Sequence, residues 1–136
     1  MCCESVVIQL DNSIMYTFNE VENVPPDPGV YVIWLVRPDG KRKVLKIGCA
    51  RTSEGQGLRG KLRQEKESRL DRQALTYRLE KDTKLARKYK TNLKDRKQRR
   101  EFILRHCRLM FVVLWTENIV DQTEEHLREK LKPVYR

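Results

Sequence analysis

The run from Val30 to Val36 constrains the fold of this chain more than any other segment. It reads Val-Tyr-Val-Ile-Trp-Leu-Val, so every position is apolar and most are β-branched or aromatic. A strand with one face in water alternates apolar and polar residues, whereas a strand covered on both faces does not. The run therefore predicts a central strand in a sheet with packed layers on both sides.

Two further strands are expected beside it. Pro38-Asp39-Gly40 has the composition of a tight turn, so the chain is expected to return as a hairpin partner. The strongest later apolar run extends from Leu109 to Trp115. The expected fold class is α/β (α+β), a small three-stranded antiparallel sheet flanked by helices, in a single domain of 136 residues. The strands are expected at Gly29–Val36, Lys43–Cys49 and Leu109–Trp115.

Helical sequence separates the second strand from the third. It opens with Leu58 and Leu62, four residues apart, and runs to about His106 with a break near Asn92. We expect residues 63–106 to form a basic helical insertion in the domain.

The two ends of the chain carry shorter elements. Two short strands, Val6–Leu10 and Ile14–Phe18, are expected within an N-terminal extension that spans residues 1–27. The last helix is expected to begin at an N-cap, Asp121, with Glu124 as its capping-box partner, and to end before Pro133.

The positive charge of the chain is concentrated in its middle. The net charge is +10, but the segment from Arg59 to Arg108 holds 19 Lys and Arg against 7 Asp and Glu, a local charge of +12. The rest of the chain holds 10 and 12 and is slightly acidic. An unbalanced basic segment predicts a surface that follows phosphates, with a merely solvated helical face as the alternative.

Several protein classes are not indicated. No apolar stretch approaches the ~18 residues of a membrane span, and the N-terminus lacks the pattern of a signal peptide. The four cysteines (Cys2, Cys3, Cys49 and Cys107) show no metal-ligand spacing. We expect a reducing, cytoplasmic or nucleoid-associated setting.

Four short motifs follow one another in the order of a known nuclease family. Gly29-Val30-Tyr31 lies on the first long strand and Lys46-Ile47-Gly48 on its hairpin partner. Gly57 to Leu62 opens the first helix, and Glu124 to Pro133 forms most of the last one. Together, from Pro28 to Arg136, they resemble the GIY-YIG nuclease superfamily as a divergent variant.

The resemblance implies a phosphodiester-cleaving site that uses Mg²⁺ or Mn²⁺. Tyr31 would lie near the attacking water and act as its general base, and Glu124 would hold the metal. A cation on the first helix would stabilise charge on the phosphate, and Lys61 stands where the family usually has an Arg. Arg59, two residues earlier, is the alternative. We expect Tyr31, Lys46 and Glu124 to converge on one pocket, with Arg59 or Lys61 at its edge.

The sequence departs from the family pattern at several positions. Lys46 replaces the second tyrosine, Glu65 stands at the usual histidine, and Arg136 at the final asparagine. Lys61 and Glu65 are four residues apart and would otherwise form only a surface ion pair. Glu124 would otherwise be only a capping residue, with Glu125 as the next candidate for the metal.

A second set of residues is expected to bind the nucleic-acid backbone. Arg59, Arg63 and Lys66 form one basic stripe at helical spacing. The residues expected to bind nucleic acid without catalysing are Arg63, Lys66, Arg69 and Arg72.

Three functions remain open at this point. The first is a divalent-metal-dependent endonuclease that acts on DNA. The second is a nucleic-acid-binding module whose GIY-YIG site no longer catalyses. The third is an interaction protein that uses its basic helices on an acidic protein. Oligomers are possible but not indicated, although a nuclease of this size that cuts both strands would have to dimerise or act twice.

Overall fold

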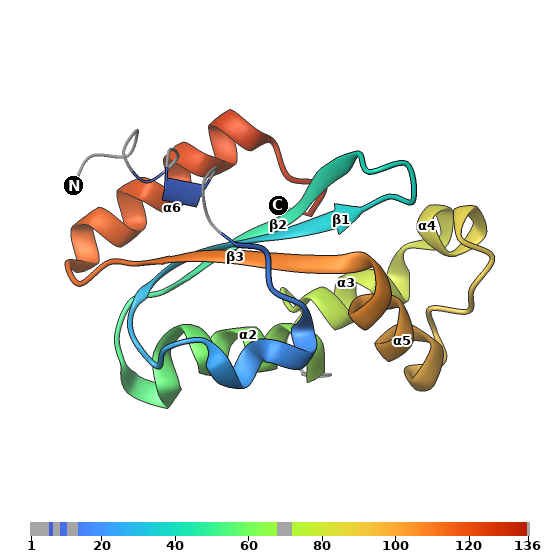
Figure 1. The fold of residues 1–136 in the computed structure, drawn as a ribbon, viewed down its shortest axis with the longest axis horizontal. Helices are drawn as coiled ribbons and strands as arrows, with labels where there is room; N and C mark the ends of the chain where they lie inside the picture. The colour runs from blue at the N-terminus through green and yellow to red at the C-terminus, as the bar shows by residue number, and fades with distance from the viewer. Residues whose placement is uncertain (1–5, 7–8, 11–13, 68–71, 136) are drawn as a thin grey trace.

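A three-stranded antiparallel sheet forms the centre of the protein (Figure 1). The computed structural model describes residues 6, 9–10, 14–67 and 72–135. The strands are β1 (Gly29–Val36), β2 (Arg42–Ala50) and β3 (Cys107–Val113), in the order β2-β1-β3. The expected fold class is confirmed, and the apolar run of β1 is indeed the central strand because it pairs on both sides.

The register of the sheet decides which side chains share a face. Tyr31 lies opposite Gly48 on β2, and Ile33 lies opposite Lys46. Directly paired residues project to the same side of an antiparallel ladder. Tyr31 and Lys46 therefore share a face but are offset by two residues. Because β2 is an edge strand, this face ends close to Lys46 and Gly48.

Helices cover both faces of the sheet (Figure 1). On one side lies α6 (Glu117–Leu131), whose buried Val120 and Leu127 pack on Val30 and Val32. On the other side lie the 3₁₀ helix η1 (Phe18–Asn23) and the helices α2 (Gly57–Glu67), α3 (Leu75–Lys81) and α5 (Arg96–His106). The remaining helical elements are the 3₁₀ helix η2 (Glu54–Gln56) and α4 (Thr83–Lys88).

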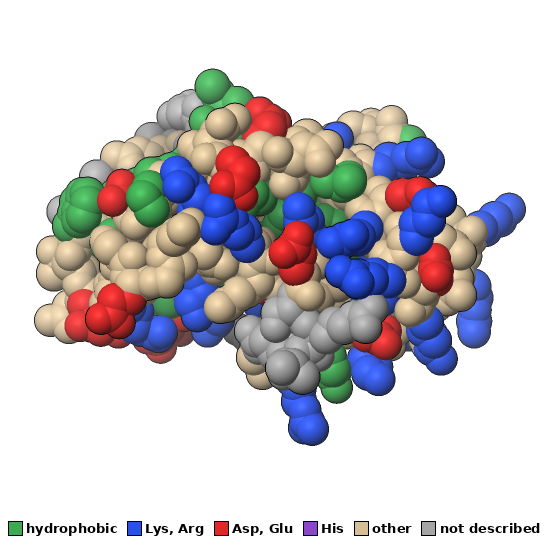
Figure 2. Space-filling model, turned by 90° about the horizontal axis from the view of Figure 1, so that it is seen from below, with side chains coloured by type: hydrophobic (Ala, Val, Ile, Leu, Met, Phe, Trp, Pro, Cys, Tyr) green, Lys and Arg blue, Asp and Glu red, His purple; other side chains and the backbone are tan. Residues whose placement is uncertain are grey.

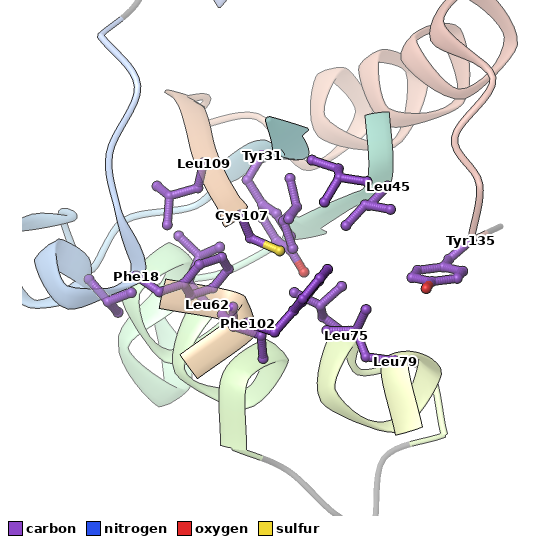
Figure 3. Packing of buried hydrophobic residues seen from close by; sticks show 14 of the residues in the cluster. Phe18, Tyr31, Leu45, Leu62, Leu75, Leu79, Phe102, Cys107, Leu109 and Tyr135 are labelled. Carbon is purple, nitrogen blue, oxygen red and sulfur yellow. The ribbon is translucent and has the colours of Figure 1, made fainter. Parts of the chain in front are cut away.

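The core on the α2 side is the larger of the two. Figure 3 shows Tyr31 reaching from β1 into this cluster, among Leu62 of α2, Leu75 of α3 and Phe102 of α5. Tyr135 lies at the rim of the same cluster. This core fixes α2 and α3 against the sheet and thereby places the polar groups described below.

Aspartates divide the long helical sequence into separate helices. The Asp82 carboxylate accepts a hydrogen bond from the amide of Leu85 at 2.9 Å and begins α4. Asp95 accepts one from the amide of Gln98 at 3.0 Å and begins α5. An aspartate that satisfies the free amides of a helix start is a strong helix-initiating residue. The expected break near Asn92 lies in the segment between these two helices.

Three expected elements are wrong. Val6 and Leu10, predicted in a strand, are helical residues, and both are buried against the α6 side because a spacing of four puts them on one helix face. The expected strand at Ile14–Phe18 is reduced to one bridge, between Tyr16 and Leu109. The last helix begins four residues before Asp121, so Asp121 caps nothing, and Glu124 lies about two turns inside α6.

The end of the described chain extends the edge of the sheet. After α6 the backbone reverses at Lys132, which has a left-handed conformation with φ of 46°. The amide of Tyr135 then donates to the carbonyl of Leu45 on β2 at 2.8 Å. This short tail brings Tyr135 beside Lys46. Among the described helices, none has the length and apolar character needed to cross a bilayer.

Candidate functional site

A polar pocket of about 350 Å³ opens at the edge strand β2. Residues of α2 line it from one face of the sheet and residues of α6 from the other. The charged residues of its wall are Lys46, Arg51, Lys61, Glu65, Glu124 and Arg128. The other polar or small residues are Tyr31, Gly48, Cys49, Gln64, Gln73 and Tyr135.

Glu65 is the centre of the deepest part of this pocket. Its side chain is 3% exposed, and one oxygen accepts from the Lys46 ammonium at 2.5 Å. The same oxygen accepts from the Leu75 amide at 2.9 Å, and the other accepts from the Tyr31 hydroxyl at 2.7 Å. One carboxylate thus joins β1, β2, α2 and the start of α3. A buried charge is tolerated only with such a set of partners.

Lys46 occupies the same buried network from the sheet edge. Its side chain is 12% exposed. Besides Glu65, the ammonium donates to the backbone carbonyl of Gln73. Lys46 therefore has structural partners on α2 and in the turn before α3, in place of the solvated position that an edge strand usually gives a lysine.

Tyr31 is held as a neutral phenol. Burial, followed by the negative charge of Glu65, raises the pKa of its hydroxyl well above the ordinary value. The ring reaches this place because Gly48 has no side chain. A Cβ at Gly48 would lie 2.3 Å from the Tyr31 hydroxyl oxygen. Glycine in the Lys46-Ile47-Gly48 motif is thus required by a close approach and not by a turn.

Glu124 enters the pocket from α6. Its side chain is 12% exposed, and one carboxylate oxygen lies 3.4 Å from an Arg128 guanidinium nitrogen. The thiol of Cys49 also donates to it, and burial together with this bond raises the pKa of Cys49 to about 12. Glu124 therefore presents its carboxylate to the pocket from a position about two turns inside α6.

The oxygen donors of the pocket fit a cation that keeps most of its water. Within the described part of the chain, no three His, Cys, Asp or Glu side chains are grouped as metal ligands. Mg²⁺ is commonly held by one or two carboxylates together with waters and substrate phosphate. Glu124 meets that requirement, whereas both oxygens of Glu65 are already occupied.

Three of the four cations in the pocket have carboxylate partners. Lys46 pairs with Glu65, Arg51 with Asp121 at 2.6 Å, and Arg128 with Glu124. Lys61 is exposed and makes no ion pair with any residue that the structure describes. The expected surface pair between Lys61 and Glu65 is therefore wrong, because Glu65 turns inward to Lys46. Lys61 is the pocket cation with its charge available to an anion.

The structure brings together four of the five expected catalytic residues. Tyr31, Lys46, Lys61 and Glu124 all line the pocket. Arg59 does not: its guanidinium donates to the backbone carbonyl of Val24 at 2.8 Å, which ties α2 to the end of η1. The convergence is a matter of geometry, and the catalytic roles stay predictions.

The expected backbone-binding residues are scattered. Arg63 is held by Glu22 of η1 and by the side chain of Gln56. Lys66 lies 3.8 Å from Glu67, and Arg72 is exposed just before α3. Arg69 lies outside the described residues. Of the basic stripe on α2, Arg63 thus pairs with a carboxylate outside the helix, which its helical spacing alone did not indicate.

Several pocket residues were not expected from the sequence. Glu65 stands at the position of the family's histidine, with a surface pair to Lys61 as the alternative, and neither interpretation predicts its buried contacts; Arg51, Cys49 and Arg128 are not among the predicted site residues. Arg128 follows Glu124 by four residues, a spacing that places them on one helix face and was available from the sequence. Nothing local indicated the role of Cys49, whose thiol meets Glu124 across two elements.

Comparisons with known proteins give one structural likeness. No family model and no curated protein matches the chain. One solved structure is similar, the GIY-YIG N-terminal endonuclease domain of UvrC from Thermotoga maritima bound to its catalytic magnesium. The identity is 18%, the TM-score is 0.48, and the alignment covers 87% of this chain and 92% of that domain. A likeness of this degree does not establish the family, so the function has to be argued from the side chains.

Proposed function

We propose that this protein is a nucleic-acid-binding phosphodiesterase that cleaves DNA with Mg²⁺ or Mn²⁺. The observation that carries the proposal is the pocket lined by one carboxylate, Glu124, by one available cation, Lys61, and by the buried Tyr31. Phosphodiester hydrolysis needs these components: a ligand for a hard cation, a cation for the phosphate and a polar group for the water.

Glu124 would hold the metal. A divalent cation bound there supplies Lewis-acid stabilisation of the negative charge that grows on the phosphate oxygens. The neighbouring Arg128 restrains the Glu124 carboxylate and adds positive charge on the same side of the pocket. Such restraint keeps the ligand in place without reorganisation during the reaction.

Lys61 would bind a nonbridging oxygen of the scissile phosphate. Its ammonium is exposed at the pocket wall and is not neutralised by a described carboxylate. A lysine acts here as a point charge, without the two-pronged geometry of arginine. The site is therefore expected to orient the phosphate less strictly than an arginine would.

Tyr31 and Glu65 would transfer the proton of the attacking water. Because the pKa of Tyr31 is raised, its phenolate is not populated near neutral pH. The Tyr31 hydroxyl donates its proton in a hydrogen bond to Glu65. The Tyr31 oxygen is therefore free to accept a hydrogen bond from a water. As the water oxygen bonds to phosphorus and the leaving oxygen departs, Tyr31 would take the water proton and pass its own proton to Glu65.

A binding-only role is the second candidate. It is favoured by one specific observation: Glu65 already engages both Tyr31 and Lys46 in a satisfied network. In that case the pocket would hold a backbone phosphate through Lys61 without cleaving it. The two candidates share nucleic-acid binding and differ in whether Glu124 supports chemistry.

The test is a plasmid-nicking assay with Mg²⁺, Mn²⁺ or EDTA on the wild type and two variants. We expect metal-dependent nicking that Glu124→Ala reduces by about 100-fold or more, since several kcal/mol of metal stabilisation are lost. Glu125→Ala is the matched control, because Glu125 is exposed on the same helix and does not line the pocket. It should nick like the wild type.

The possible failures are separable. A wild type that binds DNA but nicks with neither metal would favour the binding-only role. Nicking that survives Glu124→Ala would remove Glu124 as the ligand. DNA binding measured in EDTA should be nearly the same for all three proteins.

A further inference from the structure

A second depression lies beside the pocket, between the β1–β2 hairpin and α4. It has a volume of about 270 Å³. Its cations come from both walls: Arg37 and Lys43 from the hairpin, and Lys84 and Lys88 from α4. Its floor is apolar and consists of Leu35, Leu45, Leu85 and Val134. We call this depression the hairpin groove.

The charge of the hairpin groove is strongly positive. Four cations and one carboxylate, Asp82, line the groove, and both oxygens of Asp82 are occupied by the Leu85 amide and by the Tyr135 hydroxyl at 2.6 Å. Of the four cations, Arg37 pairs with Asp39 at 3.5 Å. Lys43, Lys84 and Lys88 are exposed and form no ion pair with a described residue. Figure 2 shows that Lys and Arg side chains also spread over the α4 and α5 end of the molecule.

The hairpin groove adjoins the pocket. Neighbouring residues belong to the two depressions: Leu45 and Val134 line the groove, while Lys46 and Tyr135 line the pocket. Tyr135 separates them and is fixed from both sides, by the carbonyl of Leu45 and by Asp82. A chain that leaves the pocket past Tyr135 therefore enters the groove directly.

The groove lies along β2 from the pocket. Lys43 precedes Lys46 by three residues on β2, or about 10 Å at 3.3 Å per residue. The groove would therefore hold the backbone within a few nucleotides of a phosphate bound in the pocket. Cations on both walls fit the repeating negative charge of the phosphates. The apolar residues of the floor offer contact to the sugars.

We propose that the hairpin groove binds the sugar-phosphate backbone of the strand whose phosphate occupies the pocket. This inference rests on the proposed function, since it assumes that the ligand is nucleic acid. The residues that hold the nucleic-acid backbone would then be Lys43, Lys84 and Lys88. They replace the basic stripe predicted on α2, in which Arg63 is held by Glu22. Lys84 and Lys88 are four residues apart and thus project from the same side of α4.

The experiment measures binding without cleavage. The probe is a fluorescein-labelled forked DNA with a 20-base-pair stem and two 10-nucleotide arms, and its anisotropy is followed in EDTA over a range of salt concentrations. The groove variant is Lys84→Glu/Lys88→Glu. The matched control is Lys94→Glu/Lys97→Glu, which makes the same charge change at two exposed lysines of the basic α5 region outside the groove.

We expect the groove variant to raise Kd by about tenfold or more at 0.1 M salt. The slope of log Kd against log salt should fall by about 1.4–1.8, the value for two lost phosphate contacts. The control should raise Kd by less than about threefold, since Lys94 and Lys97 line neither the groove nor the pocket. Equal effects of the two variants would overturn the groove and leave nucleic-acid binding intact.

A wild type that does not bind the forked DNA would overturn both the groove and the proposed function. Circular dichroism checks that each variant is folded. If the charge reversals unfold the protein, Lys84→Ala/Lys88→Ala against Lys94→Ala/Lys97→Ala gives the same comparison without adding carboxylates. Lys84→Ala/Lys88→Ala should raise Kd more than Lys94→Ala/Lys97→Ala does. A control variant that binds the DNA more weakly than the groove variant would refute the proposal.

Discussion

Replacing Glu65 by leucine tests the buried network that supports the site. Leucine has a side chain of similar length to glutamate, but it is apolar. The substitution therefore removes the hydrogen-bond acceptor of three donor groups. The Lys46 ammonium keeps only the Gln73 carbonyl as a partner, while the Tyr31 hydroxyl and the Leu75 amide lose theirs. All three groups belong to largely buried residues, since Lys46 is 12% exposed, Tyr31 3% and Leu75 0%.

The structure sets the size of the effect. Removing one member of a buried ion pair costs about 3–5 kcal/mol, because the remaining charge stays uncompensated. Each neutral buried donor without an acceptor costs about 1–3 kcal/mol. Leucine packing and movement of Lys46 toward the pocket offset part of this sum. We therefore expect a loss of about 3–5 kcal/mol in the free energy of unfolding.

The assay is urea unfolding followed by circular dichroism, with the midpoint and slope fitted together. Glu67→Leu is the matched control, since it removes the same carboxylate from the same helix at a half-exposed position. Its pairs with Lys66 and Arg100 are both 3.8 Å long, so its loss should stay below about 1 kcal/mol. If Glu65→Leu costs no more than this control, Glu65 is not a buried hub and the account of the pocket is wrong.

Two further perturbations address the surroundings of the pocket. Gly48→Ala should lower stability by about 1–3 kcal/mol in the same urea assay, because the new Cβ would meet the Tyr31 ring at 2.3 Å and displace it; an unchanged midpoint would contradict the close approach. Burial raises the pKa of the Cys107 thiol to about 12, so the unfolded chain loses this proton at a lower pH than the folded chain does. Stability should therefore be full below about pH 8.5 and fall above it by up to about 1.4 kcal/mol per pH unit for this thiol, and Cys107→Ala should show a shallower decline between pH 8 and pH 10.

The strands were the part of the fold most accessible from the sequence. The unbroken apolar run of β1 requires cover on both faces, and the Pro38-Asp39-Gly40 turn fixes the hairpin with β2. Both properties are local, so they can be predicted without knowledge of the rest of the molecule. The start of α6 was harder to predict from the sequence. Asp121 and Glu124 form a capping pattern, but the helix begins at Glu117, so this pattern lies inside it.

The candidate site could be predicted in part from the sequence, for a related reason. Tyr31 and Lys46 come from two strands of one hairpin, so their nearness follows from the turn and the pleat. Glu124 was expected beside them only through the resemblance of the motifs. The location of Glu124 in the same pocket depends on α6 reaching the β2 edge, which no local pattern specifies.

By itself the sequence determined the central hairpin, the third strand and the excess of positive charge between Arg59 and Arg108. Only the tertiary structure decided how individual charges are used. Glu65 could pair with Lys61 on a helix surface, yet it faces inward to Lys46 and Tyr31, and Arg63 meets Glu22 of η1. Helical spacing fixes which residues share a face, whereas burial of a charge depends on segments that are distant in the chain. The partners of Glu65 lie 10 to 34 residues away, and their positions exist only after α2, α3 and the sheet have packed.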